Sequence, residues 1–176
     1  YTPVDDFQVH NINLFIGEFL TRIGQVSKDS QLQTEGIRCG NFALKEQRPE
    51  GFIPYWGLSQ TDDYSYGKIH TDHFHSGFEI RALYGIWKNT EDERFKNAYT
   101  KYFKWYLKNL FDDNLIPKFT PKSKFPIDIH SCAEAILCLS TIYNDNPNQK
   151  ENLLKIIQWV IDTMEYNAGE YKFLIS

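Results

Sequence analysis

The chain contains the stretch Ile69-His70-Thr71-Asp72-His73-Phe74-His75-Ser76-Gly77-Phe78-Glu79, in which a histidine-rich polar segment leads directly into an apolar helical pattern. Shorter versions of this junction recur at Val9-His10-Asn11 and at Ile129-His130-Ser131. After each junction come two helical patterns and then a short extended stretch, near Ile53, Ile116 and Tyr171. A unit that recurs about every fifty to sixty residues is typical of helical repeat proteins. We therefore expect a single domain of three helix–turn–helix–strand repeats, over residues 1–56, 57–121 and 122–176.

The two helices of each expected repeat differ in character. First helices are apolar on every side, as in the second repeat with Phe78, Ile80, Ala82, Leu83, Ile86 and Trp87. Second helices are one-sided, as where Phe95, Tyr99, Tyr102 and Tyr106 fall opposite Lys96, Lys101, Lys104 and Lys108. A helix that is apolar all round is surrounded by protein, whereas an amphipathic helix covers a core. The fold class is therefore all-α, with an inner layer of buried helices under an outer amphipathic layer.

Composition narrows the classes of partner. The 176 residues carry a net charge of −4, which disfavours binding to nucleic acid. No apolar run is long enough to cross a bilayer and the first residues do not resemble a signal peptide, so we expect a cytoplasmic protein without membrane contact. Aromatic residues make up 16% of the chain, more than a core of this size needs. Some of these rings are therefore expected to line a surface or a cleft.

A polar rim is expected where the first helices begin. If the repeats are arranged around an axis, His10, His75 and His130 occupy equivalent places at one end of the fold. Glu79 and Glu134 each lie four residues after a histidine and so share its helix face. The remaining candidates are Asp72 and Asp128 before the helix starts, and His73, Tyr55, Trp56, Tyr64 and Tyr66 for substrate binding. Imidazoles and carboxylates gathered in this way can perform general acid–base chemistry.

A purely structural interpretation of the same residues stays open. Asp72 and Asp128 are good helix caps, and a histidine in a first helical turn can simply bond a loop. Glu79 and Glu134 can satisfy neighbouring helix ends, and Arg81 is expected to form a structural ion pair. His70, His73 and His75 could supply zinc ligands, but no distant cysteine or histidine lies at a familiar spacing. We therefore expect neither a metal nor a cofactor.

The stretch over residues 69–79, together with Phe125-Pro126-Ile127-Asp128-Ile129-His130-Ser131, resembles the α/α-toroid (six-hairpin) carbohydrate-active superfamily. The likeness is greatest to toroid proteins encoded among bacterial polysaccharide genes, and a weaker one is to the C-terminal helical domain of glucuronyl C5-epimerases. The resemblance implies a toroid whose substrate cleft lies at the N-terminal ends of the inner helices. It also implies an oligosaccharide or polysaccharide as ligand.

The resemblance implies acid–base chemistry on a uronate or a glycosidic bond, of epimerase, hydrolase or lyase type, in bacterial polysaccharide metabolism. In that hypothesis His75 and His130 transfer protons, and Glu79 and Glu134 orient them or act as acids. The alternative is a noncatalytic helical-repeat module that binds a protein or a glycan. The resemblance implies a closed toroid of about five to seven hairpins, whereas about three are expected here. We therefore expect a partial toroid that belongs to a longer chain or self-associates into a homo-oligomer.

Overall fold

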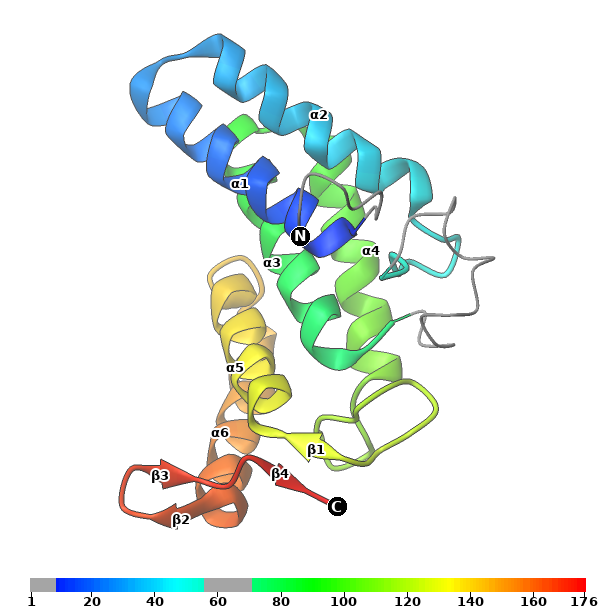
Figure 1. The fold of residues 1–176 in the computed structure, drawn as a ribbon, viewed down its shortest axis with the longest axis vertical. Coiled ribbons are helices and arrows are strands. Elements are labelled where there is room, and N and C mark those ends of the chain that lie inside the picture. The colour runs from blue at the N-terminus through cyan, green and yellow to red at the C-terminus, as the bar shows by residue number, and fades with distance from the viewer. Residues whose placement is uncertain (1–8, 56–70) are drawn as a thin grey trace, which may run out of the picture.

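The structure, a computed structural model, describes residues 9–55 and 71–176 (Figure 1). Within these ranges it contains the helices α1 (His10–Ser27), α2 (Ser30–Glu46), α3 (His73–Thr90), α4 (Glu93–Asn109), α5 (Ile129–Tyr143) and α6 (Lys150–Met164). The short strands are β1 (Ile127–Asp128), β2 (Glu165–Asn167), β3 (Glu170–Tyr171) and β4 (Leu174–Ile175). Strands β1 and β4 pair antiparallel, as do β2 and β3. The all-α class and its short extended segments are confirmed.

Aspartates begin four of the six described helices. The side chains of Asp29, Asp72, Asp92 and Asp128 each accept a hydrogen bond from a backbone N–H in the first turn of the helix that follows. An N-cap of this kind satisfies a donor that has no partner within the helix. Helix α1 differs, because its N-cap is Val9 and makes no side-chain bond. Each of the three hairpins therefore has at least one helix whose start is marked by an aspartate cap, but not every helix has one.

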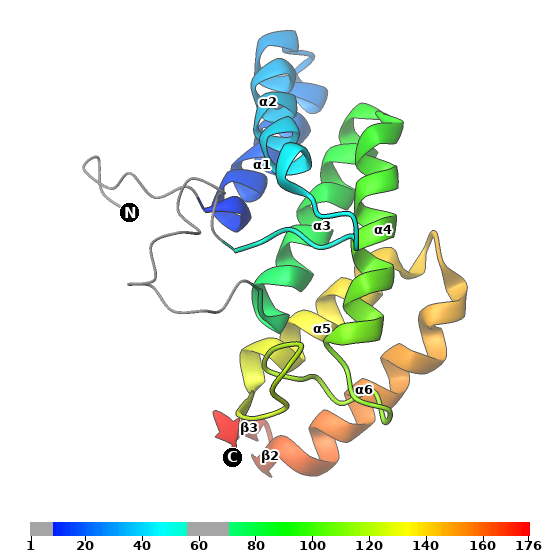
Figure 2. The ribbon, with the colours of Figure 1, turned by 90° about the vertical axis from the view of Figure 1, so that its right-hand side faces the viewer.

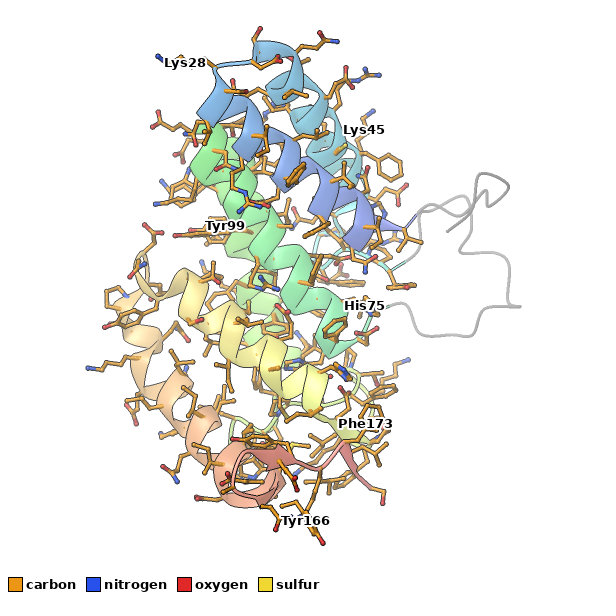
Figure 3. The ribbon with its side chains drawn as sticks, turned by 60° about the vertical axis from the view of Figure 1, so that its left-hand side comes forward. Lys28, Lys45, His75, Tyr99, Tyr166 and Phe173 are labelled. Atoms are coloured by element: carbon orange, nitrogen blue, oxygen red, sulfur yellow. The ribbon has the colours of Figure 1, made fainter. Side chains whose placement is uncertain are left out.

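The helices form two layers. Helices α1, α3 and α5 lie side by side in an inner row, and α2, α4 and α6 lie behind them in an outer row (Figures 1 and 2). Each hairpin packs its own two helices together, and α3 also packs against both α1 and α5. The three inner helices run in the same direction, so their N-terminal ends lie along one side of the molecule (Figure 3). This is the partial toroid that the repeats predict.

The core lies between the two layers. Ile80, Leu83 and Ile86 of α3 are fully buried, as are Phe95, Tyr102 and Tyr106 of α4. The first hairpin is closed more tightly by glycines: a Cβ atom at Gly36 would lie 2.7 Å from the Gly17 carbonyl oxygen and 2.6 Å from Thr21 Cγ2. Such a distance is far inside van der Waals contact, so α1 and α2 can approach this closely only because both positions lack a side chain.

One expectation about the inner layer is wrong. The sequence predicts that all three inner helices are buried on every side, but α1 exposes a row of large apolar side chains, namely Ile12, Phe15, Ile16, Phe19, Ile23 and Val26. The reason is position: α1 ends the row and has an inner-layer neighbour, α3, on one side. Within the described ranges, no helix is both long enough and apolar enough to cross a membrane.

Candidate active site at the N-terminal ends of the inner helices

Asp72 and His75 form a closely bonded polar pair at this rim. As N-cap of α3, Asp72 accepts the His75 backbone N–H through Oδ1 at 2.9 Å, and its Oδ2 lies 2.7 Å from His75 Nδ1. A carboxylate at Nδ1 holds the proton on that nitrogen, so the neutral ring carries its lone pair on Nε2. The His75 side chain is 27% exposed, and the Tyr55 ring lies edge-on to it at 4.4 Å. An oriented, accessible imidazole of this kind can act as a general base.

A second histidine reaches the same place from the neighbouring helix. The Phe74 ring centroid lies 5.2 Å from that of His75 and 6.2 Å from that of His130, which belongs to α5. The His130 side chain is 61% exposed, and its Nδ1 lies 3.7 Å from Asp128 Oδ1. Its ring also meets Phe173 at 5.6 Å, and Figure 3 shows Phe173 and His75 on the same side of the molecule. Two imidazoles from two repeats therefore lie near the same aromatic ring.

Glu79 lies behind this surface in a buried polar cluster. Its side chain points toward α4, where Tyr102 Oη donates to Oε2 at 2.8 Å, and the residue is 1% exposed. Tyr102 Oη also lies 3.0 Å from Ser76 Oγ, which is 2.8 Å from Thr71 Oγ1. Burial raises the pKa of Glu79 well above its usual value, which favours the protonated acid. Asp72 therefore orients the His75 ring through its Nδ1. Glu79, by contrast, belongs to the packing between α3 and α4.

Glu134 is held by a cation from the neighbouring inner helix. Arg81 donates from Nε and Nη2 to the two Glu134 carboxylate oxygens at 2.6 and 2.8 Å. Glu134 is 3% exposed, and the Arg81 side chain is 27% exposed. This bidentate geometry is the strongest form of the Arg–carboxylate pair and ties α3 to α5. The ion pair expected for Arg81 is confirmed.

The three predicted histidines do not occupy equivalent helical positions. Helices α1, α3 and α5 begin at His10, His73 and Ile129, so His10 corresponds to His73, whereas His75 is two residues further along. Two residues turn an α-helical side chain by about 200°. His10 and His73 are accordingly fully buried and point to the outer layer. The register that equates His10, His75 and His130 is therefore wrong.

The two buried histidines anchor the rim to the outer helices. His10 Nε2 lies 2.7 Å from Glu46 Oε2 of α2, and its ring stacks on Phe42. His73 Nδ1 lies 3.1 Å from Tyr106 Oη of α4. Burial lowers the pKa of His10 and lowers that of His73 to about 3, so His73 is neutral at physiological pH. The structure gives neither ring the exposed position that substrate contact requires.

The remaining predicted site residues are only partly described. Tyr55 is described beside His75, whereas Trp56, Tyr64, Tyr66 and His70 lie outside the described residues. Of the three possible zinc ligands, His73 meets Tyr106 and His75 meets Asp72. Over residues 9–55 and 71–176, no three histidines, cysteines or acidic residues are grouped so as to hold a metal ion.

A groove on the inner layer was not foreseen from the sequence. It has a volume of about 420 Å³ and follows α3 from Phe78 and Arg81 to Lys88, with Phe15 of α1 and Thr141 of α5 also in its lining. The Phe15 and Phe78 rings are 5.6 Å apart, and the Arg81 guanidinium lies 5.4 Å from the Phe78 centroid. Phe78, at one end of the groove, follows Phe74 by one helical turn, with 6.5 Å between the two rings.

Comparison with known proteins identifies the architecture. No family model and no curated protein matches the sequence. Among solved structures, the chain is similar to a D-mannose isomerase (TM-score 0.76, 10% identity, 99% of this chain and 50% of that one). It is also similar to the cellobiose 2-epimerase from Bacillus thermoamylovorans (TM-score 0.72, 14% identity, 96% and 45%). A third match is a GH76 α-mannanase from Bacteroides thetaiotaomicron (TM-score 0.72, 11% identity, 94% and 47%).

These matches establish the fold. The architecture is an α/α-toroid, as the resemblance at residues 69–79 and 125–134 led us to expect. The chain spans about half the length of each of these structures. It therefore contains half of a toroid, with one row of inner-helix N-terminal ends.

Proposed function

We propose that this chain belongs to a carbohydrate-active enzyme of bacterial polysaccharide metabolism, in which His75 is a general base acting on a sugar. The observation that carries the proposal is the Asp72–His75 pair, which orients an accessible imidazole at the N-terminal end of an inner helix. A carboxylate on Nδ1 also stabilises the imidazolium that forms when Nε2 takes up a proton. The similarity in fold to an isomerase, an epimerase and a mannanase supports a saccharide as the substrate.

The arrangement favours proton transfer at carbon, as in a uronate epimerase. His75 would remove the proton next to the uronate carboxylate, and the electron pair would pass into that carboxylate as an enolate. A protonated His130 would then deliver a proton to the opposite face of the carbon. The two rings come from different helices and each meets Phe74 in an edge-to-face arrangement, and Phe74 would provide an apolar contact for the sugar ring. Tyr55 offers a second aromatic contact beside His75.

The predicted carboxylates of the site already have hydrogen-bond partners within the protein, and this favours proton transfer at carbon over glycoside hydrolysis. A glycosidase uses one carboxyl group as acid and another as nucleophile or base. Here Glu134 is clamped by Arg81, and Glu79 is bonded to Tyr102 in the core. Asp72 and Asp128 both accept backbone N–H groups as helix caps. Among the six predicted acid–base residues, His75 and His130 are the most exposed.

Isotope exchange tests the proposal. The protein is incubated in D₂O with a panel of uronate-containing and neutral oligosaccharides, and deuterium at ring carbons is measured by NMR and mass spectrometry. We expect exchange that His75→Ala abolishes and Asp72→Asn reduces by about two orders of magnitude or more, because the general base and its orientation are lost. Lys104→Ala, on the exposed face of α4, is the matched control. Full exchange in His75→Ala would refute the role of His75.

A second candidate function is favoured by the exposed apolar face of α1. A concave helical repeat with such a face can bind a protein or a glycan without converting it chemically. In that case a glycan array or calorimetric titration gives binding that His75→Ala retains, and deuterium does not enter any bound sugar.

A further inference from the structure

The same backbone hydrogen bond recurs at the start of α1, α3 and α5. The first N–H of α1, that of His10, donates to the Tyr55 carbonyl at 3.4 Å. The first N–H of α3 donates to the Phe119 carbonyl at 3.1 Å, and that of α5 donates to the Phe173 carbonyl at 3.0 Å. An N–H in the first turn has no acceptor within its own helix, so these carbonyls supply the missing partner. The extended stretch that follows each hairpin is thereby tied to the start of the inner helix of that hairpin.

The residue that supplies this carbonyl is aromatic in all three repeats. The bond uses backbone atoms alone, so residues of any type could make it, and it does not explain the aromatic side chains. The rings are also not part of the buried core, since Phe173 is 62% exposed and Tyr55 and Phe119 are half-buried. Aromatic side chains that stay accessible at one repeated place are suited to bind a ligand.

Two of the three rings lie against the exposed imidazoles of the rim. The Tyr55 ring meets His75 at 4.4 Å between centroids, and the Phe173 ring meets His130 at 5.6 Å. Figure 3 shows His75 and Phe173 on the same side of the molecule, where the inner helices begin. Phe119 is bonded to the start of α3, the inner helix that packs against both α1 and α5. The three aromatic residues therefore follow the rim from one repeat to the next.

The inner helices set the spacing of these residues. Helices that pack side by side have axes about 8–10 Å apart. Two such steps, from α1 to α3 and from α3 to α5, separate the backbones of Tyr55 and Phe173 by up to about 20 Å. A single sugar ring does not reach across such a distance. A chain of sugars does, because each of its rings offers an apolar C–H face to an aromatic side chain.

We propose that Tyr55, Phe119 and Phe173 form an aromatic row, with one stacking position per repeat, that binds a saccharide chain of several sugars along the rim. Tyr55 contacts the sugar at His75, Phe173 contacts a sugar beyond His130, and Phe119 contacts the chain near the start of α3. Phe119 and Phe173 thus select an oligosaccharide or a polysaccharide over a free sugar. The proposal takes its ligand class from the proposed function, but it does not depend on proton transfer by His75.

Affinity as a function of ligand length tests the aromatic row. Calorimetric titration with galacturonate oligomers of one to six sugars, and with mannose oligomers of the same lengths, is expected to give tighter binding as the oligomer grows in at least one series. Phe173→Ala keeps the backbone carbonyl and is expected to weaken binding of the hexamer about tenfold, while binding of the monomer is unchanged. Phe119→Ala is expected to have the same effect. Tyr166→Ala, which removes a 72% exposed ring from β2 outside the row, is the matched control and binds like wild type.

Equal affinity for the monomer and the hexamer in both series overturns the aromatic row, and so does the absence of binding in both. Wild-type affinity of Phe173→Ala and Phe119→Ala for the hexamer overturns it as well, whereas Phe173→Tyr, which retains a ring, is expected to keep that affinity. Deuterium exchange separates the row from the proposed function. Exchange with an affinity that ignores ligand length would leave His75 as the base and remove the row. Length-dependent binding without exchange would leave the row and remove the catalytic role of His75.

Discussion

Replacing Glu79 with glutamine changes how the stability of the fold depends on pH. In the folded protein, Glu79 is 1% exposed and accepts a hydrogen bond from Tyr102, and burial raises its pKa well above the ordinary value of 4.5. In the unfolded chain the carboxyl group titrates normally. Between the two pKa values the folded state binds one more proton than the unfolded state. The free energy of unfolding therefore falls as pH rises through this interval, by about 1.4 kcal/mol per pH unit.

Glutamine keeps the shape and the acceptor for Tyr102 but carries no proton to lose. We expect Glu79→Gln to be close to wild type in stability at pH 5, and to become more stable than wild type as pH rises. The wild-type disadvantage grows by about 1.4 kcal/mol per unit until the folded pKa is passed, and then stays constant. Because the histidines are the same in both proteins, their contributions cancel in the difference.

Urea denaturation of the two proteins at each pH from 5 to 9, followed by circular dichroism at 222 nm, gives this difference. Parallel curves over the whole range would show that the carboxyl group is not held in its acid form. A glutamine variant that loses stability as pH rises would contradict the sign. Tyr102→Phe removes the donor at 2.8 Å that favours the carboxylate, so it should raise the pKa of Glu79 further and extend the falling part of the stability curve to higher pH at the same slope.

Three further predictions concern the packing around the rim. Arg81→Met leaves the Glu134 carboxylate buried without its partner and should lower the free energy of unfolding by about 3 kcal/mol, and Arg81→Met/Glu134→Gln should recover most of this loss in urea denaturation. Gly36→Ala forces a methyl group to within 2.7 Å of the Gly17 carbonyl and should cost about 1–3 kcal/mol by the same measurement, whereas Gly169→Ala, with open space around it, tests the cost of positive φ alone. His73 has a folded pKa of about 3 and an unfolded value of 6.5, so wild type loses stability as pH falls below 6.5, and His73→Phe should flatten that acid limb of a thermal-melting profile.

The layers of the fold could be predicted because they depend on local periodicity. A helix with apolar residues on one face, such as α4, and one with apolar residues on every face, such as α3, are distinguishable from spacing alone. The same argument failed for α1, whose apolar residues are as dense as those of α3. The two helices differ in the number of inner helices that pack beside them. The sequence of a helix does not show whether its remaining face is covered by another part of the chain.

The sequence allowed us to predict that polar residues gather at the rim, but not which partners most of them contact. The pairing of Asp72 with His75 is local and follows from the capping position three residues away. The partners of Glu79 and Glu134 lie 23 and 53 residues away in the chain, so spacing along one helix could not identify them. The register of His10 was missed because Val9, unlike Asp72 and Asp128, gives no capping signal from which to count.

The two exposed imidazoles of the rim belong to different hairpins, since His75 projects from α3 and His130 from α5. Their separation is consequently a property of the curvature of the arc, measured as the angle between successive repeats. The Arg81–Glu134 pair joins the same two helices deeper in the fold. A substitution that breaks this pair would allow α3 and α5 to shift relative to each other, and the distance between the two imidazoles would change with them.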